Sequence, residues 1–338
     1  MFSEPDQLGR EVLTSALAGG WGIAAVSLTY LPVGFGSHHW KAVDDAGTAW
    51  FVTADDLEVR QWSGDEPADG TFMRLRAALA AAQDLRASGA AFVVAPVPAR
   101  DGEPLVRADK RFSLSVYPLV EGQSFTWGEF SSPEQRRGMF DLIVATHAAP
   151  AAARRRAAAD DFVIQGRDTL EAALGQGEAG REEAPRWGPY GRPAALLISQ
   201  NAVAVRRALA RYDELAAGAG DRPPGYVLTH GEPHPGNIML AADGWRLIDW
   251  DTALLAPPER DLWSLDPGDG SLLADYATAT GVIPRPRLLE LYRIRWDLTD
   301  IALGVRRFRR PHQGNADDQE DWSILNELLA GLAQSAPG

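Results

Sequence analysis

Apolar residues occur in two different patterns along the chain, and the change comes after residue 119. Up to that point, short runs rich in Val, Ile, Leu, Phe and Thr are bounded by Gly, Pro and Asp, which is typical of strands. We predict five strands, at Ile23–Tyr30, His39–Val43, Thr48–Thr53, Ala91–Ala95 and Phe112–Leu119. Helices are predicted at Asp6–Ala18 and Thr71–Ala87. The order of three strands, a helix and two strands indicates one mainly antiparallel sheet with a helix packed on it.

Beyond this change the apolar residues recur mainly at helical spacing. Helices are predicted at Ser132–Ala149, which starts with a serine N-cap and a proline, and at Pro193–Ala217. The Ala- and Arg-rich tract Ala151–Ala159 is predicted to be a helix with a solvated face. A strand-rich island, Tyr226–Trp250, interrupts this helical part. We therefore expect a boundary between two lobes near residues 119–122.

The composition narrows the classes of function. The chain has 338 residues, of which 45% are hydrophobic, enough for a large buried core, and its net charge is −13. An acidic surface repels nucleic acids and anionic membranes, so neither is an expected partner, whereas a polycationic small molecule would be attracted. Because the chain has no cysteine, disulfides and thiolate metal sites are excluded.

The sequence also predicts where the protein acts. The first ten residues lack the apolar core of a signal peptide, and no apolar run approaches the roughly 18 residues of a membrane span. We expect a cytoplasmic protein, monomeric or homodimeric, that acts on a small molecule.

The strand-rich island contains the residues that predict a reaction. In residues 230–237, His-Gly-Glu-Pro-His-Pro-Gly-Asn, two prolines and two glycines exclude a regular helix, so a short strand leads into an irregular loop. Glu232 and Asn237 lie five residues apart, as the acid and the asparagine of a kinase catalytic loop do. Asp249 follows at the end of a predicted hairpin. Phosphoryl transfer needs a carboxylate near the attacking hydroxyl and oxygen ligands for magnesium, and these three residues supply both.

At these residues the chain resembles the aminoglycoside phosphotransferase family, which is related to choline and homoserine kinases and more distantly to protein kinases. The loop 230–237, the Ile-Asp-Trp-Asp sequence at 248–251 and the segment 258–262 all match the family pattern. The resemblance covers most of the chain and implies an α+β, bilobal protein-kinase-like fold. It implies an N-terminal nucleotide-binding lobe (1–119) with a five-stranded antiparallel sheet and a helix. It also implies a mostly helical catalytic and substrate-binding lobe (120–338), with a hinge at about 116–122.

The resemblance further implies a role for each residue of the site, with ATP or GTP and Mg²⁺ as cofactors. Glu232 would accept the proton of the substrate hydroxyl or orient it. The metal ligands would be Asn237, Asp249 and Asp251. The residues that are structural at the site would be His230, His234 and Asp261, where His230 would hold the loop by hydrogen bonds. The nucleotide would be contacted by Gly34, Gly36, Ser37, Thr53, Tyr117 and Leu119.

Two features depart from the family pattern. Glu232 stands where the family has Asp, which moves the carboxylate one methylene farther out, and a displacement of about 1 Å can lower the rate on the order of 100-fold unless the backbone adjusts. Thr53 stands where the third strand of a kinase carries its phosphate-binding lysine, and residues 71–82 of the following helix contain no acidic partner. Lys41 or Arg60 could substitute, although Lys41 is more typical of a solvated strand residue.

These departures leave several functions open. The first is an active kinase of a small hydroxylated cation, with an aminoglycoside or aminocyclitol antibiotic as the leading substrate and a choline- or homoserine-type metabolite as an alternative. Such a kinase would serve antibiotic resistance or a step in making an antibiotic. The second is a catalytically impaired binding protein with a kinase fold. A zinc hydrolase or deaminase is excluded, because prolines break the helix that a zincin needs and the cysteines of a deaminase are absent.

Two further groups of residues have an open role. Acidic side chains near the end of the chain could bind the amines of a substrate, although each alone is typical of a solvated helix; they are Asp297, Asp300, Asp317, Asp318, Glu320 and Asp321. His147 is predicted to lie at the end of a helix, where a positive charge suits the helix dipole.

Overall fold

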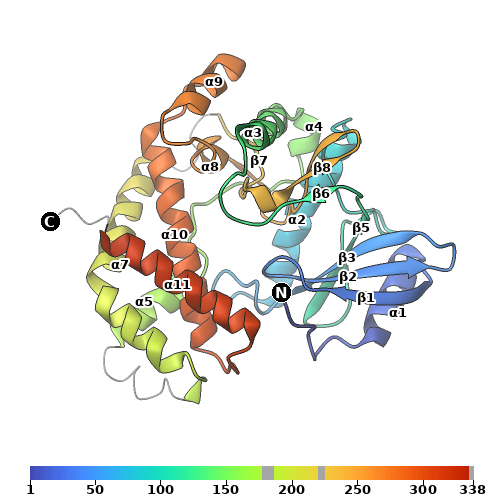
Figure 1. Cartoon of the computed structure of the whole chain (residues 1–338), viewed down its shortest axis with the longest axis horizontal. Coiled ribbons are helices and arrows are strands. Elements are labelled where there is room, and N and C mark those ends of the chain that lie inside the picture. Colours follow the sequence, from blue (N-terminus) through green and yellow to red (C-terminus); the bar gives the residue numbers. More distant parts are fainter. Residues whose placement is uncertain (177–185, 220–224, 335–338) are drawn as a thin grey trace.

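The computed structural model describes residues 1–176, 186–219 and 225–334, and a five-stranded antiparallel sheet dominates its N-terminal part. The strand order is β1-β2-β3-β5-β4. The strands are β1 (Ala25–Leu31), β2 (His38–Asp44), β3 (Ala49–Asp56), β4 (Val106–Arg107) and β5 (Phe112–Pro118). The sheet lies apart from a group of long helices, so the predicted α+β fold with a five-stranded antiparallel sheet is confirmed (Figure 1).

The two faces of this sheet differ because side chains alternate along each strand. One face packs against helix α1 (Arg10–Trp21) through Trp40, Val52 and Leu114, all of which are fully buried. The residues that alternate with these are mostly polar and lie on the opposite face; they include His39, Thr53, Asp55, Ser113 and Ser115. A sheet with one apolar face and one polar, largely buried face needs a partner for the polar groups, and that partner is described below.

The strand predicted at Ala91–Ala95 is absent from the sheet, and β4 takes its place. The segment is extended, but it pairs elsewhere: Val94 N–H donates to the carbonyl of Leu247 (3.0 Å) and Leu247 N–H donates to the carbonyl of Phe92 (2.9 Å). Val93 and Leu247 are buried in the same apolar cluster. The sequence pattern identified an extended apolar run correctly and gave it the wrong partner.

Helix α2 (Ala68–Ala87) connects the sheet to the C-terminal part. Its Leu75 and Leu79 share a buried cluster with Ile143 of α3 (Pro133–His147) and Trp250. As predicted, Ser132 is the N-cap of α3, and its Oγ accepts the N–H of Gln135 at 3.1 Å.

The Ala- and Arg-rich tract is helical only over α4 (Ala151–Arg154), which is shorter than predicted. Beyond this helix, Arg156 forms an ion pair with Asp84 of α2 (2.8 Å) in place of a continued solvated helix. The backbone at Ala158 and Asp160 instead exchanges hydrogen bonds with Leu255.

Four helices form the largest apolar core of the C-terminal part. They are α5 (Arg167–Gly175), α7 (Gly191–Ala219), α10 (Pro286–Phe308) and α11 (Ala316–Gln334). Figure 1 shows this bundle on the side of the molecule opposite the sheet. Two shorter helices, α8 (Glu259–Leu262) and α9 (Ser271–Thr280), complete the part. Within the three described segments, no helix combines the length and apolarity that crossing a bilayer requires.

Short strands between α7 and α8 carry the predicted reactive loop. β7 (Val227–Thr229) pairs with β10 (Leu254–Ala256), and β6 (Gln123–Ser124), β8 (Ile238–Ala241) and β9 (Gly244–Leu247) form a second small sheet. The loop leaves β7 and enters β8 through a short 3₁₀ turn, Pro235–Asn237. The predicted hairpin that brings Asn237 and Asp249 together is therefore present.

Candidate active site

His230 holds the loop to the strand that precedes Asp249. It is fully buried, its Nε2 donates to the carbonyl of Ile248 (2.8 Å), and its Nδ1 accepts the N–H of Glu232 (3.3 Å). Burial lowers the pKa of His230, although the nearby Asp261 acts in the opposite direction. A neutral ring with its proton on Nε2 satisfies both contacts, so His230 is placed as a loop-holding residue.

His234 and Asn237 fix the far end of the loop. His234 Nδ1 accepts the N–H of Gly236 (3.1 Å), and its Nε2 lies 3.1 Å from Nδ2 of Asn237. Asn237 Nδ2 also donates to the carbonyl of Glu232 at 2.9 Å. Since both contacts use the amide nitrogen, the Oδ1 of Asn237 has no hydrogen-bond partner in the described part of the chain.

Asp261 anchors the start of the loop. Its fully buried carboxylate accepts the backbone N–H groups of His230 (2.8 Å) and Gly231 (2.6 Å) and contacts Nε2 of His147 (3.0 Å). Burial alone would raise the pKa of Asp261. The pKa is nevertheless lowered, because the hydrogen bond from His147 and the charges of His147, Arg260 and His230 together outweigh the effect of burial. The carboxylate therefore stays ionised and keeps all three bonds.

His147 does not have the role predicted for it. Although it ends α3, its ring is buried between Asp261 and the hydroxyl of Tyr276 (3.0 Å from Nδ1), so it belongs to the anchor of the loop. The helical pattern around His147 could not predict this role, because its partners Asp261 and Tyr276 lie 114 and 129 residues away in sequence.

Asp249 has an unusual backbone and an unpaired carboxylate. Its φ of 62° is in the left-handed region that a non-glycine residue adopts only where its surroundings enforce it, and such positions gather at functional sites. Burial, followed by the charges of Asp251 and Glu232, raises the pKa of Asp249 well above its ordinary value. Among the described residues, its carboxylate makes no hydrogen bond or ion pair.

Glu232 faces the same group of negative charges. Its side chain is 32% exposed, and its Oε2 lies 3.9 Å from Nε2 of His234. Burial and the charge of Asp251 raise its pKa, and Arg260 and Arg60 offset only part of that shift. The structure thus gathers Glu232, Asn237 and Asp249 at one place, where among the described residues their side-chain oxygens make no hydrogen bond.

Asn237 and Asp249 fit a magnesium ion that is shared with phosphate groups. Mg²⁺ takes oxygen ligands and is usually held by one or two carboxylates plus substrate phosphates. Asp251 is less available, because its Oδ2 lies 2.6 Å from Nη2 of Arg60. Across residues 1–176, 186–219 and 225–334, no group of three or more His, Cys, Asp or Glu side chains is arranged to hold a metal by itself.

The turn between β1 and β2 faces this group from the sheet. Gly34 (φ 69°) and Gly36 (φ 79°) both need the left-handed conformation, and Ser37 is buried with its Oγ donating to Asp55 Oδ1 (2.8 Å). Tyr117, on the polar face of the sheet near the end of β5, lies close enough to Asp249 and Asp251 for their charges, after burial, to raise its pKa. Leu119 follows β5 and is half-buried.

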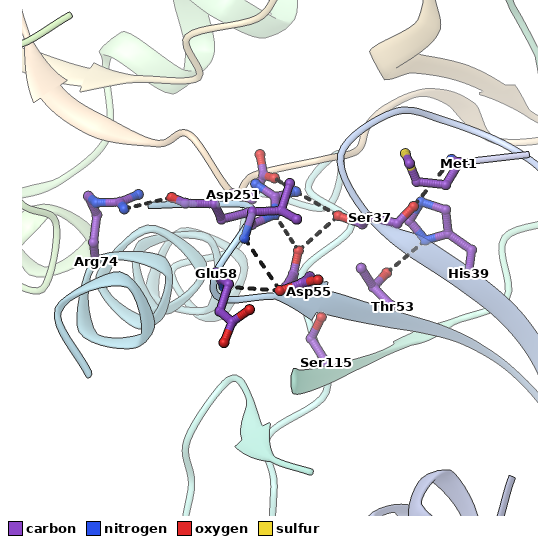
Figure 2. Close-up of polar contacts among 12 residues, drawn as sticks. Met1, Ser37, His39, Thr53, Asp55, Glu58, Arg74, Ser115 and Asp251 are labelled. Carbon is purple, nitrogen blue, oxygen red and sulfur yellow. Dashed lines mark hydrogen bonds and ion pairs between the residues drawn. The ribbon is translucent and has the colours of Figure 1, made fainter. Parts of the chain in front are cut away.

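Thr53 lies on the polar face of β3, and its Oγ1 contacts Nδ1 of His39 at 3.2 Å. Lys41, two residues after the partner of Thr53 on β2, is exposed. The cation at this place is Arg60, whose guanidinium lies 2.7 Å from Asp55, 2.6 Å from Asp251 and 2.6 Å from Ser37 Oγ. Figure 2 shows Ser37, Asp55 and Asp251 converging on this point.

Comparison with known proteins agrees with this geometry. A model of the phosphotransferase enzyme family matches residues 31–302. Protein StrN of Streptomyces griseus is 33% identical in an alignment of 261 positions that covers 72% of this chain and 74% of that protein.

Two solved structures share the fold over almost the whole chain. Spectinomycin phosphotransferase in complex with ADP and spectinomycin has a TM-score of 0.68 and 16% identity, covering 97% of this chain and 98% of that chain. Amicoumacin kinase in complex with AMP-PNP, Ca²⁺ and Ami has a TM-score of 0.60 and 13% identity, covering 98% and 95%. Together with the family match over residues 31–302, these findings show that the chain belongs to the phosphotransferase enzyme family, whose members transfer a phosphoryl group to a hydroxyl group.

Proposed function

We propose that this phosphotransferase uses ATP and Mg²⁺ to phosphorylate a hydroxyl group of a small cationic molecule of the aminoglycoside or aminocyclitol class. The observation that carries the proposal is the convergence of Glu232, Asn237 and Asp249, whose side-chain oxygens make no hydrogen bond with the described residues. The use of an adenine nucleotide is supported by the ADP bound in spectinomycin phosphotransferase and the AMP-PNP in amicoumacin kinase.

In this mechanism Glu232 orients the substrate hydroxyl and accepts its proton, since a carboxylate with a raised pKa is a better base near neutral pH. Asn237 and Asp249 would hold the magnesium ion, which neutralises charge on the phosphates. His230, His234 and Asp261 keep the loop in place.

A carboxylate near Glu232, that of Asp300, supports a cationic substrate. Burial, followed by the charges of Glu232, Asp297 and Asp321, raises the pKa of Asp300 on α10 to about 8. In the described part of the chain, the Asp300 carboxylate has no hydrogen bond or ion pair, and the charges that act on its pKa are those of other carboxylates. An ammonium group would relieve this repulsion, and it would lie near the proposed base.

The proposal is tested by incubating the protein with ATP, Mg²⁺ and a panel of aminoglycosides, spectinomycin-like aminocyclitols, choline and homoserine. We expect a mass gain of one phosphate on an aminoglycoside or aminocyclitol. Replacing Glu232 with Gln should lower kcat about 100-fold or more, because the base is lost while the shape is kept. The exposed Glu129→Gln is the matched control and should behave as wild type. Phosphorylation of choline or homoserine alone would contradict the proposed substrate class, and ATP binding without any product would indicate an impaired binding protein.

A further inference from the structure

We propose that Arg60 binds the nucleotide phosphates in place of the missing strand lysine, and that Asp55 holds Arg60 as an acidic partner holds that lysine in other kinases. This inference rests on the proposed function, because it assumes that a nucleoside triphosphate occupies the site beside Asp249. In kinases the phosphate-binding lysine lies on the third strand and forms an ion pair with a glutamate of the next helix. Here both residue types are absent from those positions, since Thr53 replaces the lysine and residues 71–82 contain no acid.

The guanidinium of Arg60 lies where such a cation is needed. It contacts Ser37 in the two-glycine turn of the sheet and Asp251, two residues after Asp249, each at 2.6 Å. Ser37, Asp55 and Asp251 lie close together in Figure 2. A phosphate chain lying between the turn and the proposed metal ligands would therefore pass beside Arg60.

Asp55 supplies the acidic partner from the same strand as Thr53. Asp55 and Thr53 are two residues apart, so both point to the polar face of β3. The carboxylate of Asp55 is 3% exposed, lies 2.7 Å from Nε of Arg60, and accepts the hydroxyl of Ser37 at 2.8 Å. Asp55 thus fixes the cation and the turn together.

The backbone around Arg60 is held from two other elements. Arg74 of α2 donates to the carbonyl of Arg60 (3.0 Å), and Arg306 of α10 donates to the carbonyls of Val59 and Gln61 (2.5 Å each). These three bonds fix the segment on both sides of Arg60. The guanidinium is therefore positioned before any ligand binds, which reduces the entropy lost on binding.

The donors of Arg60 are not used up by these contacts. Nη2 makes the contacts with Ser37 and Asp251, whereas Nε lies near Asp55 without a directed hydrogen bond. The described residues provide no partner for Nη1. Since a guanidinium binds phosphate oxygens through two parallel N–H groups, Arg60 can engage a phosphate while Asp55 keeps it in place.

Other cations near the site are committed elsewhere. Arg260 is buried behind Gly231 and donates to Thr229 Oγ1 and the carbonyl of Thr252, both at 2.8 Å. Lys41 is exposed on β2. Arg60 is also the cation whose charge acts on both Glu232 and Asp249.

The test compares nucleotides that differ only in their phosphates. For Arg60→Gln we expect the Kd for ATP to rise about 10- to 100-fold, the usual effect of losing hydrogen bonds to a charged group, while the Kd for adenosine changes less than about twofold. Arg60→Lys should recover much of the ATP affinity. Arg111→Gln is the matched control, because Arg111 pairs with the neighbouring Asp56 (2.6 Å), and it should bind ATP as wild type does.

A second variant protects the test against misfolding of Arg60→Gln. Thr53→Lys, introduced together with Arg60→Gln, should restore part of the ATP affinity by returning a cation to the third strand. Wild-type ATP affinity in Arg60→Gln, or an equal loss for ATP and adenosine, would overturn this inference alone. Failure of the wild-type protein to bind ATP at all would overturn the proposed function as well.

Discussion

At the scale of single residues, the site is defined by carboxylates that lack partners. Asp249 and Glu232 have raised pKa values because they are recessed and surrounded by like charges, and Asp300 adds a third. Elsewhere the chain pairs its buried acids: Asp160 is bonded to Arg295 and Tyr292, and Asp261 to two backbone N–H groups. The contrast marks the unpaired group as the place where a ligand supplies the missing positive charge.

Replacing Asp300 with Asn should stabilise the protein and weaken substrate binding. The ordinary pKa of an Asp carboxyl is near 3.8, and in the folded protein that of Asp300 is raised to about 8. Asp300 therefore binds a proton more tightly in the folded state than in the unfolded state. As the pH rises from about 4 to about 8, this difference lowers the free energy of unfolding. The variant should therefore be more stable than the wild type by an amount that grows between pH 4 and pH 8. At pH 8 the gain in free energy of unfolding should be at least about 1 kcal/mol, or about 2 °C in Tm. Thermal unfolding from pH 4 to pH 8 measures it.

The same variant should raise the KM for a cationic substrate about tenfold or more and leave the KM for ATP unchanged. Asp141→Asn, at an exposed position of α3, is the control. A variant with unchanged KM and a pH-independent Tm difference would show that Asp300 neither binds the substrate nor titrates as described.

At the scale of elements, the catalytic loop depends on a close approach of two segments. Gly231 has φ 101°, and a Cβ on it would lie 2.3 Å from the guanidinium of Arg260, which itself bonds Thr229 and Thr252. The loop can adopt its shape because this position has no side chain. The segment of Asp261 and the loop of Glu232 are in this way packed together.

Gly231→Ala should therefore lower the free energy of unfolding by more than the strained backbone conformation alone explains. Gly89 has nearly the same φ (102°) but open space around it, so Gly89→Ala measures the backbone strain, which is on the order of 1–2 kcal/mol. In urea unfolding we expect Gly231→Ala to lose more stability than Gly89→Ala, and we expect it to reduce kcat. Equal losses for the two variants would mean that Arg260 moves aside easily.

Some elements of the fold and of the site could be predicted from the sequence, and others could not. Alternation along the strands was sufficient to predict β1, β2, β3 and β5, because it is a local pattern, but not β4. The spacing of Glu232, Asn237 and Asp249 led us to expect these residues at one site. The pairing of Ala91–Ala95 and the role of His147 depend on partners more than 100 residues away, and no local pattern encodes them. Arg60 was one of two candidates, and only its contacts with Asp55 and Asp251 separate it from Lys41.

At the scale of the whole molecule, the site is formed where the sheet meets the helical part. The polar face of the sheet contributes Asp55 and the turn between β1 and β2 contributes Ser37. The loops after β7 and β9 contribute Glu232 and Asp249. Segment 116–122, which leads from β5 to β6, is the hinge in our proposal, with lobes 1–119 and 120–338 on either side. Helix α2 nevertheless shares a core with α3 and Trp250, so the two lobes are coupled through α2.

The most direct test of this account is a crystal structure with Mg²⁺ and a non-hydrolysable ATP analogue. We expect the triphosphate between Ser37 and Asp249, with magnesium on Asn237 and Asp249 and Arg60 bonded to phosphate oxygens. A nucleotide bound elsewhere, or one bound here with Asn237 and Asp249 facing away from its metal, would contradict the account.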